Sequence, residues 1–276
     1  MNPKVIGRTP RAIRILGVSL LALALMPGLA QAWGVVGHRV AGRIAEARLT
    51  PAARSALRAL LEPGESLADV STWADENRAD HPEAATWHYI NIPITEPRYD
   101  RKFILKQGSV VDRIEHFRSV LEDPRASRSQ RIMALRYLVH FIQDVHQPLH
   151  VGHRNDKGGN DLQVQWFGRN DNLHRIWDSG LLGEARMSER NRVSKLTATI
   201  TPELAEAWSK GGVDEWANES LDIAREAYKH PGTGAAIRRG DRLGEDYQAA
   251  NLPLAERRVT QAGVRLAQVL NEILKP

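Results

Sequence analysis

The 276-residue chain contains no cysteine. Disulfide scaffolds and zinc sites built from thiolates are therefore excluded. Residues 33–276 are numerous enough to bury a hydrophobic core without crosslinks. If metal ions stabilise this protein or take part in its chemistry, their ligands must be histidine, aspartate or a chain terminus.

Long hydrophobic runs are scarce as well. The exception covers residues 15–26, after a basic leader, and the small-x-small pattern Ala30-Gln31-Ala32 follows it. This pattern predicts a secretory signal peptide over residues 1–32, cleaved after Ala32. The alternative is a membrane anchor, but the run falls short of the roughly 20 residues that a transmembrane helix needs. We expect a mature domain over residues 33–276 that is secreted or periplasmic and has no stable membrane association.

Excess charge of one sign is largely confined to the leader. The whole chain has 38 Lys and Arg against 33 Asp and Glu, a formal net charge of +5. The leader contributes four basic residues and no acidic one, so the mature chain has 34 against 33, or +1. Overall charge therefore gives no reason to expect nucleic-acid binding, and any anion-binding site must be local.

What the sequence does contain is histidine and aspartate at metal-ligand spacing. In HFIQDVHQPLH, residues 140–150, His140 and Asp144 are four apart and share one helix face. Pro148 predicts that the helix ends near residue 146 and that His150 lies beyond it. Neutral imidazole and carboxylate in this arrangement suit a metal ion bound by nitrogen and oxygen. A single pair of this kind is also common as a surface hydrogen bond.

A second pair, His174 and Asp178 in LHRIWD, repeats the spacing and favours a metal site over a chance surface pair. Signal-peptide cleavage adds another donor. A free α-amino group at Trp33, with a reference pKa near 7.7, can bind metal together with its own carbonyl oxygen. His38 follows at the start of a predicted helix. Taken locally, Trp33 and His38 also fit a frayed terminus and an ordinary helix-face histidine.

Asp75, Arg78 and His88 are further candidates. Asp75 and Arg78 share a helix face, where a solvated salt bridge is the usual arrangement. Alternation along TWHYINIP places His88 on the face opposite Tyr89 and Asn91. By itself, His88 also fits a hydrogen-bonded core histidine.

Hydrophobic residues with helical periodicity dominate the chain. We predict an all-α protein, a single mainly helical domain with one short β-hairpin. The hairpin is expected from LQVQWF at residues 162–167, with a turn at 168–172, and Asn172 is expected to cap the next helix. The predicted helices cover residues 38–49, 50–61, 66–78, 109–121, 127–146, 188–197, 202–210, 213–230 and 246–274, and residues 86–93 are predicted to be extended.

Six short motifs occur in a fixed order: W-G-x-x-G-H at 33–38, W-A-D at 73–75, W-H-Y at 87–89, H-x-x-x-D-x-x-Q-P-L-H at 140–150, G-G-N at 158–160 and H-x-x-x-D at 174–178. In this order they resemble the three-zinc, single-strand-specific nucleases of fungi and plants, of the nuclease P-one and S-one type. The helical tail with WANES is also similar. The resemblance implies the mainly helical fold of this family, which phospholipase C shares.

The resemblance also implies three zinc ions and their ligands. The first ion would be bound by Asp75, His88, His140 and Asp144, the second by Trp33, His38 and Asp144, and the third by His150, His174 and Asp178. Three Zn²⁺ bring a charge of +6 and the three carboxylates return −3. A cavity with this excess of positive charge favours a phosphate group.

By the same resemblance, Asp75 would orient the nucleophile and Arg78 would hold a phosphate oxygen. Tyr89 would stack on a base and Asn160 would help to shape the cleft. Asn91 stands where the fungal pattern commonly has an acidic residue, and since an amide both donates and accepts, the base preference is open. The implied function is an exported, monomeric endonuclease that hydrolyses single-stranded DNA and RNA to 5′-nucleotides, with 3′-nucleotidase activity on nucleotides.

Two other functions stay open. A zinc-dependent phospholipase C acting on phosphatidylcholine-type lipids has a similar three-zinc site. Its pattern usually has a longer gap after the terminal tryptophan and a glutamate where Asp178 stands, so the sequence favours the nuclease. The third function is that of a non-catalytic binding protein stabilised by zinc. Each implied zinc ion has few enough protein ligands to leave room for water or substrate, which favours an enzyme over this function.

Overall fold

The structure, a computed structural model, describes residue 1 and residues 33–275. The predicted signal peptide and its cleavage site after Ala32 lie outside the described residues. In the described part of the chain, no helix combines the length and the apolar character that crossing a bilayer requires. The architecture is mainly helical with a few short strands, which confirms the predicted fold class.

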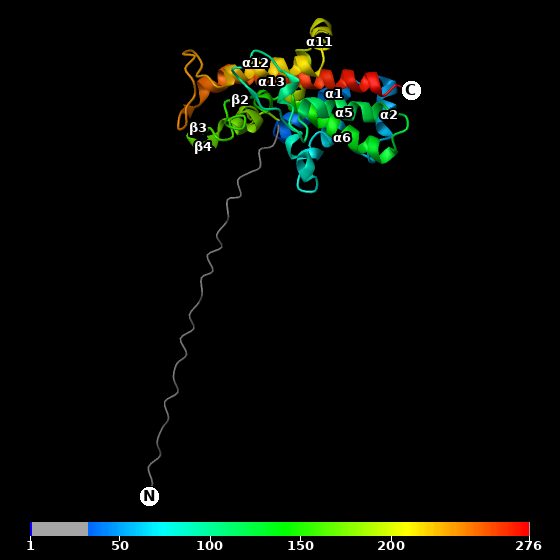
Figure 1. Ribbon diagram of the computed structural model, residues 1–276, viewed down its shortest axis with the longest axis horizontal. Coiled ribbons are helices and arrows are strands. Elements are labelled where there is room, and N and C mark those ends of the chain that lie inside the picture. The colour runs from blue at the N-terminus through cyan, green and yellow to red at the C-terminus, as the bar shows by residue number, and fades with distance from the viewer. Residues whose placement is uncertain (2–32, 276) are drawn as a thin grey trace.

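The longest helix, α13 (Glu245–Ile273), runs along the molecule and organises the fold (Figure 1). α1 (Val35–Ala47) packs along this helix. A Cβ atom at Gly263 would come within 2.8 Å of the Ile44 side chain, so glycine permits this close approach of the two helices.

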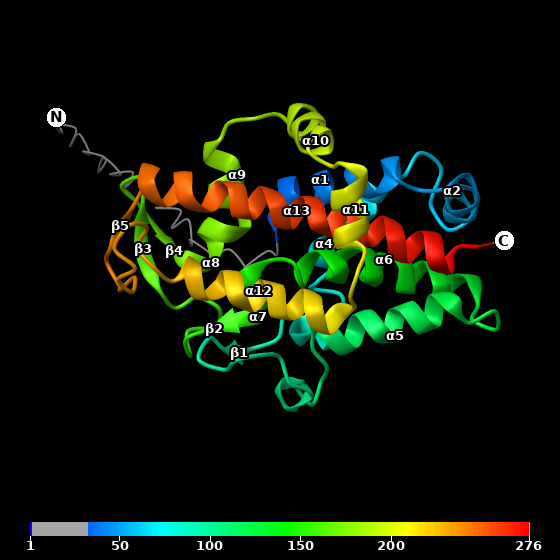
Figure 2. The same cartoon turned by 90° about the horizontal axis from the view of Figure 1, so that it is seen from above.

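Three further long helices complete the bundle: α5 (Val110–Glu122), α6 (Arg128–Asp144) and α12 (Val213–Ala227). α5 packs against α6, α6 packs against α13, and α12 runs beside them and contacts α5 (Figure 2). The predicted starts of α5 and α6 are confirmed, because Ser109 and Ser127 each form a capping box with the residue three positions later.

Shorter helices connect and cover this bundle. Their bounds are α2 (Pro51–Arg58), α3 (Leu67–Val70), α4 (Trp73–Glu76), η1 (Pro82–Thr86), η2 (Arg101–Phe103), α7 (Pro148–Val151), α8 (Leu173–Arg175), η3 (Ile176–Gly180), α9 (Leu181–Glu184), α10 (Glu189–Ala198) and α11 (Pro202–Trp208).

The prediction of one continuous helix over residues 66–78 is wrong, because α3 and α4 divide it. At the break, the Ser71 hydroxyl donates a hydrogen bond to the carbonyl oxygen of Ala68 at 2.8 Å. Hydroxyls that hydrogen-bond nearby carbonyls in this way compete with the helical pattern. The break also leaves the Ser71 carbonyl oxygen available to His140, whose Nδ1 lies 2.8 Å away.

The strands form two small sheets. β1 (Ile92–Pro93) pairs in parallel with β2 (Gly152–His153). β3 (Gln163–Trp166) pairs antiparallel with β4 (Arg169–Asn172) and in parallel with β5 (Arg242–Leu243). The three-stranded sheet lies at the end of the molecule opposite α2 (Figure 2).

The predicted hairpin is confirmed, but its predicted turn at residues 168–172 is wrong. The turn consists of Phe167 and Gly168, with φ of 48° and 77°, and the residues that follow form the second strand. A two-residue turn with positive φ at both positions matches the twist of the strands. Asn172 caps α8 as predicted, since its side chain accepts from the Arg175 amide at 2.8 Å.

The predicted extended segment 86–93 is only partly a strand, because β1 takes up its last two residues. The predicted alternation nevertheless holds. His88 and Ile90 are buried, whereas Tyr89 and Asn91 are half-buried. The segment therefore presents one face to the interior and the other to the surface.

Pro148 shapes the segment after α6. It occupies the first position of α7, where its missing N–H costs no hydrogen bond. α6 ends at Asp144, and His150 lies within α7 rather than beyond all helices, which corrects the predicted end near residue 146. The change of direction at the proline turns His150 back toward the residues at the end of α6.

Candidate metal centre

Eight of the predicted ligand side chains converge inside the molecule, in three groups whose donor atoms lie within 4.8 Å of one another. All of them except Asp75 are buried. The first group is Asp75, His88 and His140, the second group is His38, His140 and Asp144, and the third group is His150, His174 and Asp178. The structure brings these side chains together, and their role as metal ligands stays a prediction.

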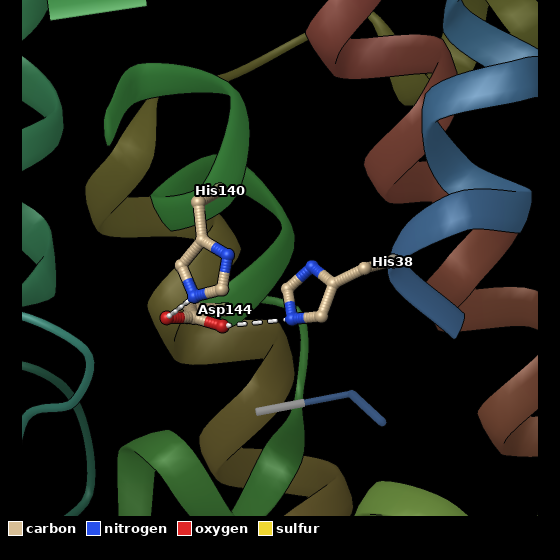
Figure 3. A group of neighbouring side chains, drawn as sticks. All are labelled: His38, His140 and Asp144. Atoms are coloured by element: carbon tan, nitrogen blue, oxygen red, sulfur yellow. Dashed lines mark ion pairs between the residues drawn. The ribbon is translucent and has the colours of Figure 1, made fainter. Parts of the chain in front are cut away.

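Asp144 lies between the first and second groups. Its Oδ2 is 3.0 Å from Nδ1 of His88 and 3.1 Å from Nε2 of His140. Its Oδ1 is 3.5 Å from Nε2 of His38, which comes from α1 on the other side of the site (Figure 3). The two carboxylate oxygens therefore face different groups, which is the geometry that a bridging ligand requires.

The third group lies beside the other two. Asp178 Oδ1 is 3.7 Å from Nε2 of His150, and its Oδ2 is 3.3 Å from Nε2 of His174. The two imidazole rings stack with their centroids 5.0 Å apart. Asp144 Oδ1 lies 3.9 Å from His150 Nδ1, so the three groups share one polar interior.

Oxygen acceptors orient four of the five histidines in the same way. Nδ1 of His140 donates to the Ser71 carbonyl oxygen, and Nδ1 of His38 donates to Gln143 Oε1 at 2.6 Å. The matching contacts of the third group are His150 Nδ1 with the His88 carbonyl oxygen at 2.7 Å and His174 Nδ1 with the Gly158 carbonyl oxygen at 2.8 Å. In the neutral imidazole these contacts place the proton on Nδ1 and leave the Nε2 lone pair facing the carboxylates, which is how histidines are held in metal sites.

Unpaired buried atoms concentrate at this site. Among the described residues, buried atoms without a hydrogen-bond partner include Asp75 Oδ1, His38 Nε2, Asp144 Oδ1, His150 Nε2 and Asp178 Oδ2. A buried polar atom without a partner is costly, and buried polar atoms are normally satisfied. A cation satisfies together the lone pairs of imidazole nitrogens and carboxylate oxygens that face one another. The residues present therefore fit divalent metal ions.

The protonation states agree with this fit. Burial lowers the pKa of His38, His88 and His150, and it lowers the pKa of His174 to about 4. These imidazoles are therefore neutral and able to bind metal at neutral pH.

The carboxyls and His140 shift in the opposite direction. Burial raises the pKa of Asp178 well above its ordinary value and that of Asp144 to about 7. Burial opposes protonation of His140 too, but the carboxylates of Asp144 and Asp75 outweigh it and raise its pKa to about 9. Without a metal ion, protons thus offset the charge of the buried carboxylates, and a bound metal ion would take the place of these protons.

Two glutamines support the ligand residues, and the sequence alone did not single them out. Besides Gln143, Gln147 donates from Nε2 to Asp178 Oδ1 at 2.5 Å and accepts from the Leu149 amide. Gln147 belongs to the Q-P-L-H motif, which was the available signal for it. Gln143 sits beside Asp144 and had no distinguishing signal.

Trp33 lies next to the third group. Its side chain is fully buried, and the following amide, that of Gly34, donates to the Asp178 carbonyl oxygen at 2.7 Å. The first residues of the predicted mature domain are therefore attached to the site rather than frayed. Metal binding by the Trp33 amino group and carbonyl oxygen stays a prediction.

A cavity of about 330 Å³ opens beside the first and third groups. The predicted catalytic residue Arg78 and the predicted substrate-binding residues Tyr89, Asn91 and Asn160 all line it. Lys157 lines it too, and the sequence prediction missed this residue although it directly precedes the G-G-N motif. The remaining lining residues are Ala85, His88, Leu149, His150 and His174.

Comparison with known proteins agrees with this geometry. The family model described as S1/P1 Nuclease matches residues 33–275. The chain belongs to the S1/P1 nuclease family. The match begins at Trp33, directly after the predicted cleavage site, and includes every residue of the three groups.

Individual relatives from plants and fungi cover most of the chain. It is 33% identical to Endonuclease 2 of Arabidopsis thaliana over 87% of this chain and 90% of that protein. It is 29% identical to Nuclease S1 of Aspergillus oryzae over 94% of this chain and 98% of that protein. Nuclease P1 of Penicillium citrinum is 28% identical over 87% of this chain and 97% of its own length. The predicted family and the prediction of a phosphodiester-cleaving nuclease are confirmed.

Proposed function

We propose that this nuclease is an exported, zinc-dependent endonuclease that cuts single-stranded DNA and RNA to 5′-nucleotides and also removes 3′-phosphates from nucleotides. The observation that carries the proposal is the convergence of three His/Asp groups beside a cavity lined by Arg78 and Tyr89. Phosphate-binding and base-binding side chains thus face the same space as the candidate metal ligands.

Zinc is the metal that the donors favour. The three groups offer imidazole nitrogen and carboxylate oxygen and no sulfur. Bound there, the ions would supply positive charge for a phosphate and would lower the pKa of a bound water. We assign Asp75, His88, His140 and Asp144 to the first ion, Trp33, His38 and Asp144 to the second, and His150, His174 and Asp178 to the third.

Asp75 and Arg78 have the catalytic roles in this proposal. Asp75 Oδ1, without a hydrogen-bond partner among the described residues, can accept a hydrogen bond from the attacking water and so orient the lone pair of that water toward phosphorus. Arg78 brings a permanent positive charge into the cavity, where it can hold a phosphate oxygen. Lys157 adds a second cation on the same wall.

The cavity suits an unstacked base. The half-buried ring of Tyr89 can stack on any base through its π-face. Asn91 can donate to or accept from the base edge. Asn160 is held by a hydrogen bond from Nδ2 to the Lys157 carbonyl oxygen at 2.9 Å, so it stands as a fixed part of the wall. A base within a duplex cannot enter without leaving its stack, which disfavours double strands.

Export and a monomeric state are the remaining parts of the proposal. Export is supported by the leader, with its basic start, apolar run and Ala30-Gln31-Ala32 pattern. Cleavage after Ala32 would free the Trp33 amine that the second ion needs. The mature domain is then residues 33–276.

The deciding experiment compares substrates side by side. The mature protein, reconstituted with zinc, is given single-stranded DNA, single-stranded RNA, duplex DNA and phosphatidylcholine vesicles, and a 3′-mononucleotide is tested separately. We expect rapid cleavage of both single strands to products with 5′-phosphates, slow cleavage of duplex and loss of activity in a chelator. Preferential hydrolysis of the lipid would overturn the proposal in favour of phospholipase C.

A further inference from the structure

Residues 154–160, in the loop that follows β2, form one rim of the cavity and have an unusual backbone. Asn155, Lys157, Gly158 and Gly159 have φ of 58°, 53°, 62° and 86°. Residues with a side chain adopt this left-handed region at a cost, so other contacts must hold the loop in place. A Cβ at Gly158 would lie 2.1 Å from the Leu149 carbonyl oxygen, so the loop is also pressed against α7.

Asp156 is the residue that holds this loop. Its Oδ1 accepts hydrogen bonds from the Gly159 amide at 3.0 Å and from the Arg154 amide at 3.1 Å. A third bond, at 2.8 Å, comes from the hydroxyl of Tyr228, which lies at the end of α12 and is only 2% exposed. One carboxylate oxygen thus ties both halves of the loop to a rigid helix.

The loop in turn orients a member of the third group. The Gly158 carbonyl oxygen accepts the Nδ1 proton of His174, so Nε2 of His174 faces Asp178 at 3.3 Å. A connected series of contacts therefore leads from Tyr228 through Asp156 and Gly158 to His174. Hydrogen bonds to the far nitrogen of a ligand histidine set its tautomer and ring orientation.

We propose that Tyr228 and Asp156 are positioning residues for the third metal ion, acting through the Gly158 carbonyl oxygen on His174. This inference rests on the proposed three-zinc function. It predicts that changes at Tyr228, which is neither a candidate metal ligand nor a lining residue of the cavity, selectively weaken one of three ions. A purely structural role would instead lower overall stability and leave the relative affinities of the three ions unchanged.

The test is a zinc titration of the mature, metal-stripped protein against a chromophoric chelator. We expect Tyr228→Phe to weaken one ion about tenfold and Asp156→Ala to weaken the same ion up to about 100-fold. Asp156→Asn retains an oxygen acceptor, so its loss should be intermediate. Circular dichroism monitors the folding of each variant. If Asp156→Ala does not fold, Tyr228→Phe still tests the proposal, because it removes only one hydroxyl.

His174→Ala identifies which ion is affected. It should bind two ions with wild-type affinity, and adding Tyr228→Phe to it should change neither of them, because the third ion is already lost. The matched control is Tyr137→Phe, which removes a buried hydroxyl that has no hydrogen-bond partner among the described residues. It should leave all three affinities unchanged.

Two outcomes overturn the inference and are distinguishable from each other. The positioning role alone would be overturned if Tyr228→Phe and Asp156→Ala both bind three ions with wild-type affinity. It would also be overturned if Tyr228→Phe lowers zinc affinity equally in the wild-type protein and in His174→Ala. Wild-type protein that never binds a third ion would overturn the proposed function, and the inference would fall with it.

Discussion

His38 on α1 and Asp144 at the end of α6 face each other across the interior, with 3.5 Å between Nε2 and Oδ1. Neither atom is exposed, and neither has a hydrogen-bond partner among the described residues. The pair therefore costs folding free energy unless a cation lies between the two atoms. The same carboxylate serves His88 and His140 through its other oxygen, so Asp144 is the residue on which two of the three groups depend.

Asp144→Asn should therefore remove more metal than any other single ligand substitution. We expect two of the three zinc ions to be lost and activity on single-stranded DNA to fall by more than about 100-fold, since even indirect changes at metal sites cost 10- to 100-fold in affinity. Metal content by mass spectrometry and initial rates measure the effect. The matched control is Asp222→Asn, at an exposed carboxylate that pairs with Arg225, three residues further along the same helix. Three retained ions in Asp144→Asn would contradict the bridging role.

The start of the mature chain should matter for activity. Protein that begins at Trp33 is compared with protein that carries a few additional residues before it. The longer form cannot offer the Trp33 amine, so its second ion should bind more weakly and its activity should be low. Zinc titration and kcat on a single-stranded oligonucleotide measure both effects, and removal of the additional residues by a protease should restore them. Equal zinc affinity and equal rates in both forms would reject the terminal ligand.

Lys157 should act on binding rather than on the chemical step. Lys157→Met is expected to raise KM for an oligonucleotide several-fold with little change in kcat. One lost phosphate contact should also reduce the slope of log affinity against log salt by about 0.7 for a single strand. The control is Lys210→Met, at an exposed lysine that pairs with Glu206. If both variants have the wild-type salt dependence, Lys157 does not contact phosphate.

Zinc affinity should fall as the pH is lowered. The carboxylates of Asp144 and Asp75 raise the pKa of His140 to about 9, so at neutral pH His140 holds a proton that a metal ion must displace, and burial, which raises the pKa of Asp144 to about 7, adds proton competition below that pH. Each displaced proton makes the affinity about tenfold weaker per pH unit on the acidic side of its pKa. His174, with its pKa of about 4, adds proton competition only near that pH.

Calorimetry of zinc binding in two buffers of different ionisation enthalpy, between pH 5 and 8, measures the proton release directly. We expect release of at least about one proton at pH 7 and weaker binding at pH 5. Retention of all three ions with unchanged affinity down to about pH 4 would contradict this assignment.

The sequence predicted those parts of the site that depend on side-chain identity and helical spacing. His140 with Asp144 and His174 with Asp178 share a face because each pair is four residues apart, and the helical periodicity of hydrophobic residues located α5 and α6. The sequence could not predict which carbonyl oxygens orient the histidines. Those of Ser71 and Gly158 become available only through a helix break and a left-handed loop, which tertiary contacts stabilise.

The pairing of β5 with β3 was missed for a related reason. A two-residue strand such as Arg242–Leu243 shows no alternation, and its partner lies far away in the sequence. Tyr228 and Asp156 were missed because one hydrogen bond between a helix end and a loop leaves no pattern in either segment.

The most direct measurement is X-ray diffraction from crystals of active, mature enzyme at wavelengths on either side of the zinc absorption edge. We expect three anomalous peaks that appear only above the edge: one beside Asp75, His88 and His140, one between His38 and Asp144, and one beside His150, His174 and Asp178. Active enzyme without zinc peaks at these groups would contradict this expectation.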